Sequence, residues 1–210
     1  LIQAAMGKIP CDLTIGNVQF LNVITGEIYP ASVDILDGFV VLVREEGQKP
    51  VLPAKKYYDG CGRYLIPGFI DTHVHVESTM MIPENLSRAI LPWGTTTICT
   101  DPHEIGNVMG VEGVEFMLDN AKKSKLRQYV LAPSCVPSVP GLENAGAEFF
   151  AREVGELLDM DDVIGIAEIM DYVGVIHDSE RMHTIIDEGL RRGMFLQGHA
   201  PYCFGRELAA

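Results

Sequence analysis

The sequence predicts an α/β protein, a partial (β/α)8 barrel of the TIM type that follows a small N-terminal β domain. Before residue 62, short β-branched segments alternate with Gly, Asn, Asp and Pro, which is typical of strands and turns. After Gly62, apolar runs alternate with longer stretches of helical spacing, which is typical of β/α units around a parallel sheet. We therefore expect a small β-sandwich-like domain over residues 1–62 and about five β/α units of a barrel over residues 63–210.

The N-terminal region is expected to be structural. Between Asp12 and Tyr58 it contains the segments DLTIG, VQFLNVITG, SVDILDGFVVLV and PAKKYYD, which predict antiparallel strands joined by turns. It lacks helical periodicity, and the first histidine of the chain is His73. Residues that carry chemistry are therefore sought in the barrel region.

The barrel region alternates predicted strands with predicted helices. Continuous apolar runs such as VIGIA fit strands that are buried on both faces. A closed (β/α)8 barrel usually needs about 250 residues, so we expect the chain to hold only the front part of one. An open doubly wound sheet is the alternative, but the polar residues at the strand ends favour the barrel. The strands are expected at 68–72, 95–100, 127–133, 163–168 and 194–198, and the helices near 83–91, 111–123, 147–158 and 179–192.

The composition argues against several classes of partner. The formal net charge of −13 disfavours binding to the nucleic-acid backbone, which relies on clustered Lys and Arg. No run approaches the roughly 20 apolar residues that cross a bilayer. The five cysteines are an odd number without a C-x-x-C pair, which argues against a disulfide framework and against a thiolate zinc site. We expect a cytoplasmic protein that binds a small molecule, with no nucleic acid and no membrane as partner.

The motif PGFIDTHVHVE, from Pro67 to Glu77, is the strongest chemical signal. Side chains alternate along a strand, so His73 and His75 project from one face and can bind a single metal ion. The pair alone is a weak signal, because short motifs often mislead. Its position at a strand end strengthens it, because parallel barrels assemble their active sites there.

Two later strand ends carry further candidate ligands. His199 follows the fifth strand in LQGHAP, and neutral imidazole is a favoured ligand of divalent transition metals. Glu168 ends the fourth strand in VIGIAEIMDY, where a buried carboxylate is costly unless it is paired or bound to a cation. A carboxylate that bridges two metals would remove that cost, whereas an ordinary ion pair is the alternative interpretation of Glu168.

Other polar residues are expected on the same rim. Asp101, His103 and Glu104 follow the second strand in CTDPHEIGN, where they can shape a substrate pocket or orient the ligands. Asp101 and Glu104 are candidate catalytic residues, although Asp-Pro also starts turns. Glu77 and Ser78, together with His103, are candidate substrate-binding residues.

Five blocks of the sequence resemble adenine deaminases of the amidohydrolase superfamily. They are PGFIDTHVHVESTMM, TTTICTDPHEIGNV, APSCVPSVPGLE, AEIMDY and QGHAP, in that order, and the resemblance covers roughly residues 12–205. The first block indicates only the superfamily. The combination of TDPHEIGN, PSCVPSVPG and AEIMDY is much more specific.

The resemblance implies a site with two divalent metal ions, manganese or iron, with zinc as an alternative. It implies that His73 and His75 hold one ion, that Glu168 bridges both, and that His199 binds the second. Many superfamily relatives bridge with a carboxylated lysine on the fourth strand, but this sequence has no lysine after Lys125. The family also supplies a histidine from the sixth strand and an aspartate from the eighth, and neither region lies in this sequence.

The implied reaction is hydrolytic deamination of adenine to hypoxanthine and ammonia, a step of purine salvage and adenine catabolism. A metal can lower the pKa of bound water from 15.7 to about 7, which provides a nucleophile. The proton shuttle is expected to be the eighth-strand aspartate, with Glu104 or Asp101 as local helpers. Glu168 is also expected to be catalytic. The alternatives are an amidohydrolase that acts on a cyclic amide and a non-catalytic, incomplete part of such an enzyme. A homo-oligomer is expected, because exposed strand edges favour association.

Overall fold

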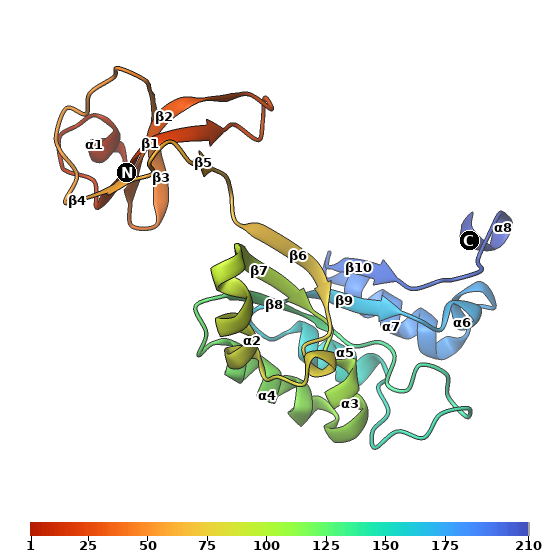
Figure 1. Ribbon diagram of the computed structural model, residues 1–210. Helices are drawn as coiled ribbons and strands as arrows, with labels where there is room; N and C mark the ends of the chain where they lie inside the picture. The colour runs from red at the N-terminus through yellow and green to blue at the C-terminus, as the bar shows by residue number, and fades with distance from the viewer. Residues whose placement is uncertain (210) are drawn as a thin grey trace. The chain divides into compact units, whose positions relative to one another are not determined.

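The computed structural model describes residues 1–209, which form two compact units, residues 1–67 and residues 68–209 (Figure 1). The boundary between the two units lies after Pro67, later in the chain than residue 62, where the sequence predicted it. The reason is local: β5 (Tyr64–Leu65) pairs with a strand of the first unit. Among the described residues, no helix is both long enough and apolar enough to cross a membrane.

The N-terminal unit is one five-stranded sheet with a short helix, α1 (Ile2–Ala5). It does not have the two packed sheets of the expected sandwich. The antiparallel prediction is right for β1, β2 and β3 and wrong for β4, which runs parallel to β1; β5, which lies beyond the predicted segments, also runs parallel to β1. The connection between β3 and β4 carries the chain across the sheet from β3 to the far side of β1, so β4 can run in the same direction as β1. The strands are β1 (Leu13–Leu21), β2 (Ile28–Leu36), β3 (Phe39–Glu45), β4 (Lys56–Asp59) and β5.

The second unit is built on a parallel sheet whose spatial order, β10-β9-β8-β7-β6, follows the order of the chain. A doubly wound sheet reverses its order at a switch point, whereas a barrel advances strand by strand in one direction. The order therefore identifies part of a barrel. The strands are β6 (Phe69–Val74), β7 (Thr95–Thr100), β8 (Arg127–Ala132), β9 (Val163–Ile169) and β10 (Phe195–Gly198).

The long helices lie on one side of this sheet (Figure 1) and bury its core. All four agree with the sequence prediction to within a few residues: α2 (Pro83–Ile90), α4 (Val111–Ala121), α5 (Ala151–Leu158) and α7 (Glu180–Arg191). The core between α4, α5, α7 and the sheet contains fully buried side chains such as Val114, Val154 and Ile185. Short elements that the sequence did not predict are η1 (Glu77–Thr79), η2 (Leu91–Trp93), α3 (His103–Met109), α6 (Tyr172–Ile176) and α8 (Arg206–Ala209).

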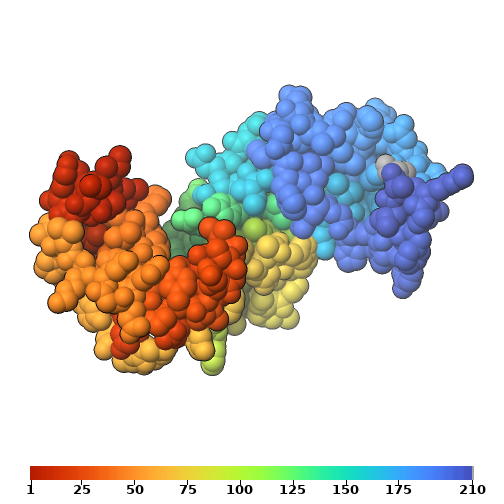
Figure 2. Space-filling view, turned by 90° about the horizontal axis from the view of Figure 1, so that it is seen from above, coloured from red at the N-terminus to blue at the C-terminus, as the bar shows by residue number. Residues whose placement is uncertain are grey.

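The sheet of the second unit is curled, so its two outer strands approach each other at their carboxyl ends. Gln197 on β10 places its side-chain amide 3.0 Å from Nδ1 of His73 on β6, although these strands do not pair. Seen from above, the yellow segment with β6 and the blue segment with β10 meet on one face of the unit (Figure 2). Because the strands are parallel, this curl gathers the residues at all five strand ends around one point.

Candidate metal centre

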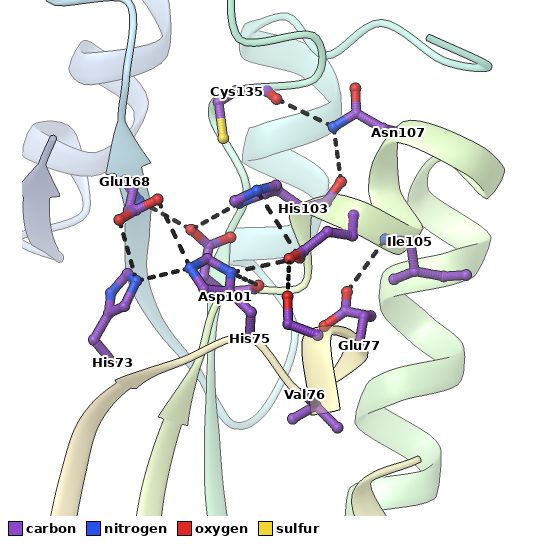
Figure 3. A network of polar contacts seen from close by, with 12 residues as sticks. His73, His75, Val76, Glu77, Asp101, His103, Ile105, Asn107, Cys135 and Glu168 are labelled. Carbon is purple, nitrogen blue, oxygen red and sulfur yellow. Dashed lines mark hydrogen bonds and ion pairs between the residues drawn. The ribbon is translucent and has the colours of Figure 1, made fainter. Parts of the chain in front are cut away.

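Two histidines at the end of β6 form the middle of the site (Figure 3). The Nε2 atoms of His73 and His75 lie 3.0 Å apart, and both side chains are partly buried. Alternation along the strand places both rings on the same face. Because cation-to-nitrogen bonds are about 2.0–2.1 Å long for zinc, two nitrogens this close can be ligands of one ion.

The Nδ1 atom of each ring has a partner that decides which ring nitrogen carries the proton. Nδ1 of His75 lies 3.0 Å from the backbone carbonyl oxygen of Asp101. A carbonyl only accepts, so Nδ1 carries the proton and Nε2 keeps its lone pair for a cation. The amide of Gln197 stands at Nδ1 of His73, and its oxygen can play the same part once the amide is turned over. Sequence analysis missed Gln197, although its position two residues before His199 was a usable signal.

Glu168 lies at the end of β9, where it contacts three histidines. Its Oε1 atom is 3.1 Å from Nε2 of His73 and 3.1 Å from Nδ1 of His199, and its Oε2 atom is 3.9 Å from Nε2 of His75. Burial alone would raise the pKa of this carboxyl, but the hydrogen bond with His199 and the nearby histidines outweigh burial and lower it. Glu168 is therefore held as a carboxylate.

Asp101 is fully buried at the end of β7 and belongs to the innermost group. Single ligand atoms of His73, His75, Asp101 and Glu168 all lie within 4.8 Å of one another. His199 is not a member of this group; it is exposed and contacts Glu168. The Oδ2 atom of Asp101 accepts from the backbone nitrogen of Glu168 at 3.4 Å, whereas Oδ1 is buried without a hydrogen-bond partner.

Helix α3 supplies two more side chains to the rim. His103, its first residue, has Nδ1 3.2 Å from Oδ2 of Asp101. Burial lowers the pKa of His103, but its contacts with the Asp101 carboxylate and the Cys135 side chain outweigh burial and raise the pKa to about 11. Glu104 places Oε2 3.4 Å from Nδ1 of His75 and accepts from Ser78 through Oε1 at 3.0 Å.

Glu77, a predicted substrate-binding residue, contacts the first turn of α3. Its Oε1 atom accepts from the backbone nitrogen of Ile105 at 3.2 Å, which ties η1 to the first turn of α3. Its Oε2 atom is buried without a hydrogen-bond partner, and burial raises the pKa of the carboxyl. In this structure Glu77 binds the protein's own backbone.

The donor set fits a divalent cation. Imidazole nitrogens and carboxylate oxygens are ligands that suit zinc, manganese and iron. The unpaired, fully buried Oδ1 atom of Asp101 also fits, because a buried carboxylate oxygen without a partner is costly unless a cation or water completes it. His73, His75, Asp101 and Glu168 are the residues that would hold such an ion.

Comparison with curated proteins finds relatives that are named adenine deaminase. Adenine deaminase of Klebsiella pneumoniae (strain 342) is 43% identical over 209 residues, and adenine deaminase 2 of Rhizobium meliloti (strain 1021) is 42% identical. Each alignment covers 100% of this chain but only 34% and 35% of the relative. The resemblance to adenine deaminases is thus confirmed, and the chain spans about a third of the length of these curated relatives.

Solved structures confirm the fold class. N-acyl-D-glutamate deacylase of Bordetella bronchiseptica, complexed with zinc and a phosphonate inhibitor, is similar with a TM-score of 0.60 at 16% identity, over 91% of this chain and 45% of that one. Atrazine chlorohydrolase of Arthrobacter aurescens TC1, complexed with zinc, is similar with a TM-score of 0.52 at 13% identity, over 79% and 51%. The family model described as "Amidohydrolase family" matches residues 64–208. The chain belongs to the amidohydrolase family.

Proposed function

We propose that the protein to which this chain belongs is a metal-dependent hydrolase that deaminates adenine to hypoxanthine and ammonia. The observation that carries the proposal is the convergence of His73, His75 and Glu168 from two separate strand ends. The 42–43% identity to proteins named adenine deaminase supports the choice of substrate. Such a reaction would serve purine salvage in the cytoplasm.

In this proposal the site holds two divalent cations, manganese or iron, with zinc as the alternative. His73 and His75 would bind one of them, Glu168 would bridge both, and His199 would bind the second. Asp101, whose oxygen stands within the same group, is a further ligand candidate. A bound divalent cation supplies Lewis acidity, which makes water a nucleophile near neutral pH.

The carboxylates of the chain would carry the protons. In the reaction the bond from adenine C6 to the exocyclic nitrogen breaks and a bond from C6 to the water oxygen forms. One proton of water ends on the departing ammonia and the other on a ring nitrogen. Glu104 is placed to move such a proton, because its Oε2 atom is buried without a hydrogen-bond partner.

Ser78 and His103 would contact the purine from the rim. Ser78 is exposed and already donates to Glu104, while His103 stands between Asp101 and Glu104. An imidazolium at position 103 would donate to a ring nitrogen or to the developing oxygen of the product. Glu77 would act indirectly, by holding η1 against α3.

The test uses the full-length protein loaded with manganese, iron or zinc and supplied with adenine. The proposal predicts stoichiometric ammonia and hypoxanthine, and a loss of rate of about 100-fold or more in Glu168→Gln. Glu156→Gln is the matched control, because Glu156 is exposed on α5, and it should keep the wild-type rate. Absence of ammonia with every metal, or turnover of a cyclic amide in place of adenine, would overturn the proposal.

A further inference from the structure

A second group of candidate ligands lies beside the metal centre and shares only Asp101 with it. Asp101 directly follows β7, His103 begins α3, and Cys135 lies in the loop that follows β8 (Figure 3). One ligand atom from each residue lies within 4.8 Å of the other two. Three separate elements therefore bring an oxygen, a nitrogen and a sulfur donor together.

Two of the three residues are buried, His103 is partly buried, and the polar atoms of the group are incompletely paired. Asp101 is 0% exposed and Cys135 is 1% exposed. Oδ1 of Asp101 is buried without a hydrogen-bond partner, and Nδ1 of His103 is buried with only an ion-pair contact, at 3.2 Å from Oδ2 of Asp101. Buried polar atoms without partners are rare in folded proteins, and an ion is one of the few things that can satisfy them.

The mixture of donors selects a class of ion. Thiolate sulfur favours soft and borderline cations, whereas manganese and magnesium prefer oxygen. Three protein ligands of sulfur, nitrogen and oxygen type, with one position left for water, are typical of tetrahedral zinc. The missing C-x-x-C pair does not exclude such a site, because here a single thiol joins donors from other elements.

We propose that Asp101, His103 and Cys135 form a further cation site for a thiophilic divalent ion, with zinc as the ion and cadmium as its probe. On binding, the Cys135 thiol and any protonated His103 ring release their protons to solvent, and sulfur–metal and nitrogen–metal bonds form without oxidation or reduction.

The site would make the enzyme sensitive to excess zinc, and this part rests on the proposed function. Asp101 also belongs to the group that contains His73, His75 and Glu168. A cation that binds Asp101 from the Cys135 side withdraws the carboxylate from that group. Zinc beyond the content of the metal centre should therefore lower the rate of adenine deamination about tenfold, a change in the range found when a partner of a metal ligand is altered.

The binding test titrates the full-length protein with cadmium and records the ultraviolet charge-transfer absorbance of a thiolate–cadmium bond. The wild type should show this band with about one equivalent bound at the new site, since Cys135 is the only thiol in the group. Cys135→Ser should lack the band. Cys203→Ser is the matched control, because Cys203 is also buried but belongs to none of the candidate ligand groups, and it should keep the band.

His73→Ala separates this proposal from the proposed function. It removes a ligand of the metal centre but none of the new site, so the cadmium band should persist in it. His103→Asn, a second variant in case Cys135→Ser is unstable, should weaken cadmium binding at least about tenfold. A band that survives in Cys135→Ser, or a wild type without the band, would overturn the proposal whether or not adenine is deaminated.

Discussion

A single backbone carbonyl sets the chemistry of the central histidine. The oxygen of Asp101 lies 3.0 Å from Nδ1 of His75, so the proton is fixed on Nδ1 and the lone pair on Nε2 is free. That free nitrogen lies 3.0 Å from Nε2 of His73 and 3.9 Å from Oε2 of Glu168. At the scale of the residue, the contact between His75 and the backbone of Asp101 therefore leaves Nε2 free to bind a cation before any cation is present.

We expect His73→Ala to lower the divalent metal content of the full-length protein by about one ion per chain, because the change removes an imidazole ligand from the group. Elemental analysis after dialysis against metal-free buffer measures this. His183→Ala is the control, because His183 is exposed on α7 and contacts only Asp178 and Asp187. Equal metal content in the two variants would count against the assignment.

Part of the site could be predicted from local sequence, and part could not. The spacing of His73 and His75, and the carboxylate after an apolar strand at Glu168, are local patterns that strand geometry converts into position. The structure brings these three residues together, and their roles stay predictions. Cys135 and Gln197 were missed as members of the site, because their contacts depend on how the sheet curls and how one loop folds, which no periodicity encodes.

At the scale of the element, Arg181 on α7 holds the loop between β8 and α5. Its guanidinium donates to the backbone oxygens of Phe149, Ser134, Val136 and Pro137 at 3.1–3.3 Å. The same loop carries Cys135, and the Ser134 hydroxyl donates to the backbone oxygen of Glu168 at 2.7 Å. Burial lowers the pKa of Arg181, yet the guanidinium keeps its proton because an Arg side chain is not deprotonated in proteins.

Arg181→Met should destabilise the protein by about 2 kcal/mol, because it leaves buried carbonyl oxygens without donors. The loop between residues 133 and 150 should also exchange its amide hydrogens faster. Hydrogen exchange and urea unfolding measure both effects. Arg191→Met on the same helix is the control, since Arg191 is exposed and pairs with Glu188 only, and it should change neither quantity. Unchanged exchange in Arg181→Met would show that the loop is held by other contacts.

The N-terminal sheet contains a buried ion pair that predicts its response to acid. Asp34 and Arg44 on neighbouring strands contact at 2.6 Å, with side chains 8% and 7% exposed. Burial would raise the pKa of Asp34, but hydrogen bonds from Arg44 and Thr14 outweigh burial and lower it. A carboxyl with a lowered pKa stabilises the folded state above its unfolded value of about 3.9, and the effect is lost as pH falls through the folded-state pKa.

Asp34→Asn should therefore cost about 3 kcal/mol near neutral pH, because it leaves the Arg44 charge buried without its partner. The cost should begin to shrink as the pH falls below about 3.9, the pKa of the carboxyl in the unfolded chain, and it should be lost once the pH passes the lowered folded-state pKa, where the wild-type carboxyl is neutral as well. Unfolding midpoints across this pH range measure it. Asp12→Asn, which breaks the exposed pair with Lys55, is the control and should have little effect. A pH-independent cost for Asp34→Asn would contradict the explanation.

The positions of helices and strands were predicted better than the pairing of the strands. The ends of the long helices and of the parallel strands follow from periodicity and from turn residues, so these elements were found. Helix α3 was missed, because its sequence HEIGNVM contains Gly and Asn and follows Pro102, which are features of a loop. The parallel pairing of β4 with β1 was missed, because local sequence does not show which way a returning chain runs.

At the scale of the whole molecule, the strand order of the second unit explains why distant residues meet. The sheet advances in one direction and curls, so His73 on β6 and Gln197 on β10 touch although 124 positions separate them in the chain. The fold class and the family are confirmed by the comparisons. The two metals and the substrate are proposals about the whole protein, and the homo-oligomer stays a prediction. This chain spans about a third of the length of its curated relatives.

The most direct test is the anomalous scattering of manganese in crystals of the full-length protein grown with that ion. The account predicts an anomalous peak about 2 Å from Nε2 of both His73 and His75, in contact with a carboxylate oxygen of Glu168 or Asp101. A manganese peak elsewhere in the molecule, with these two imidazoles left without a metal neighbour, would contradict it.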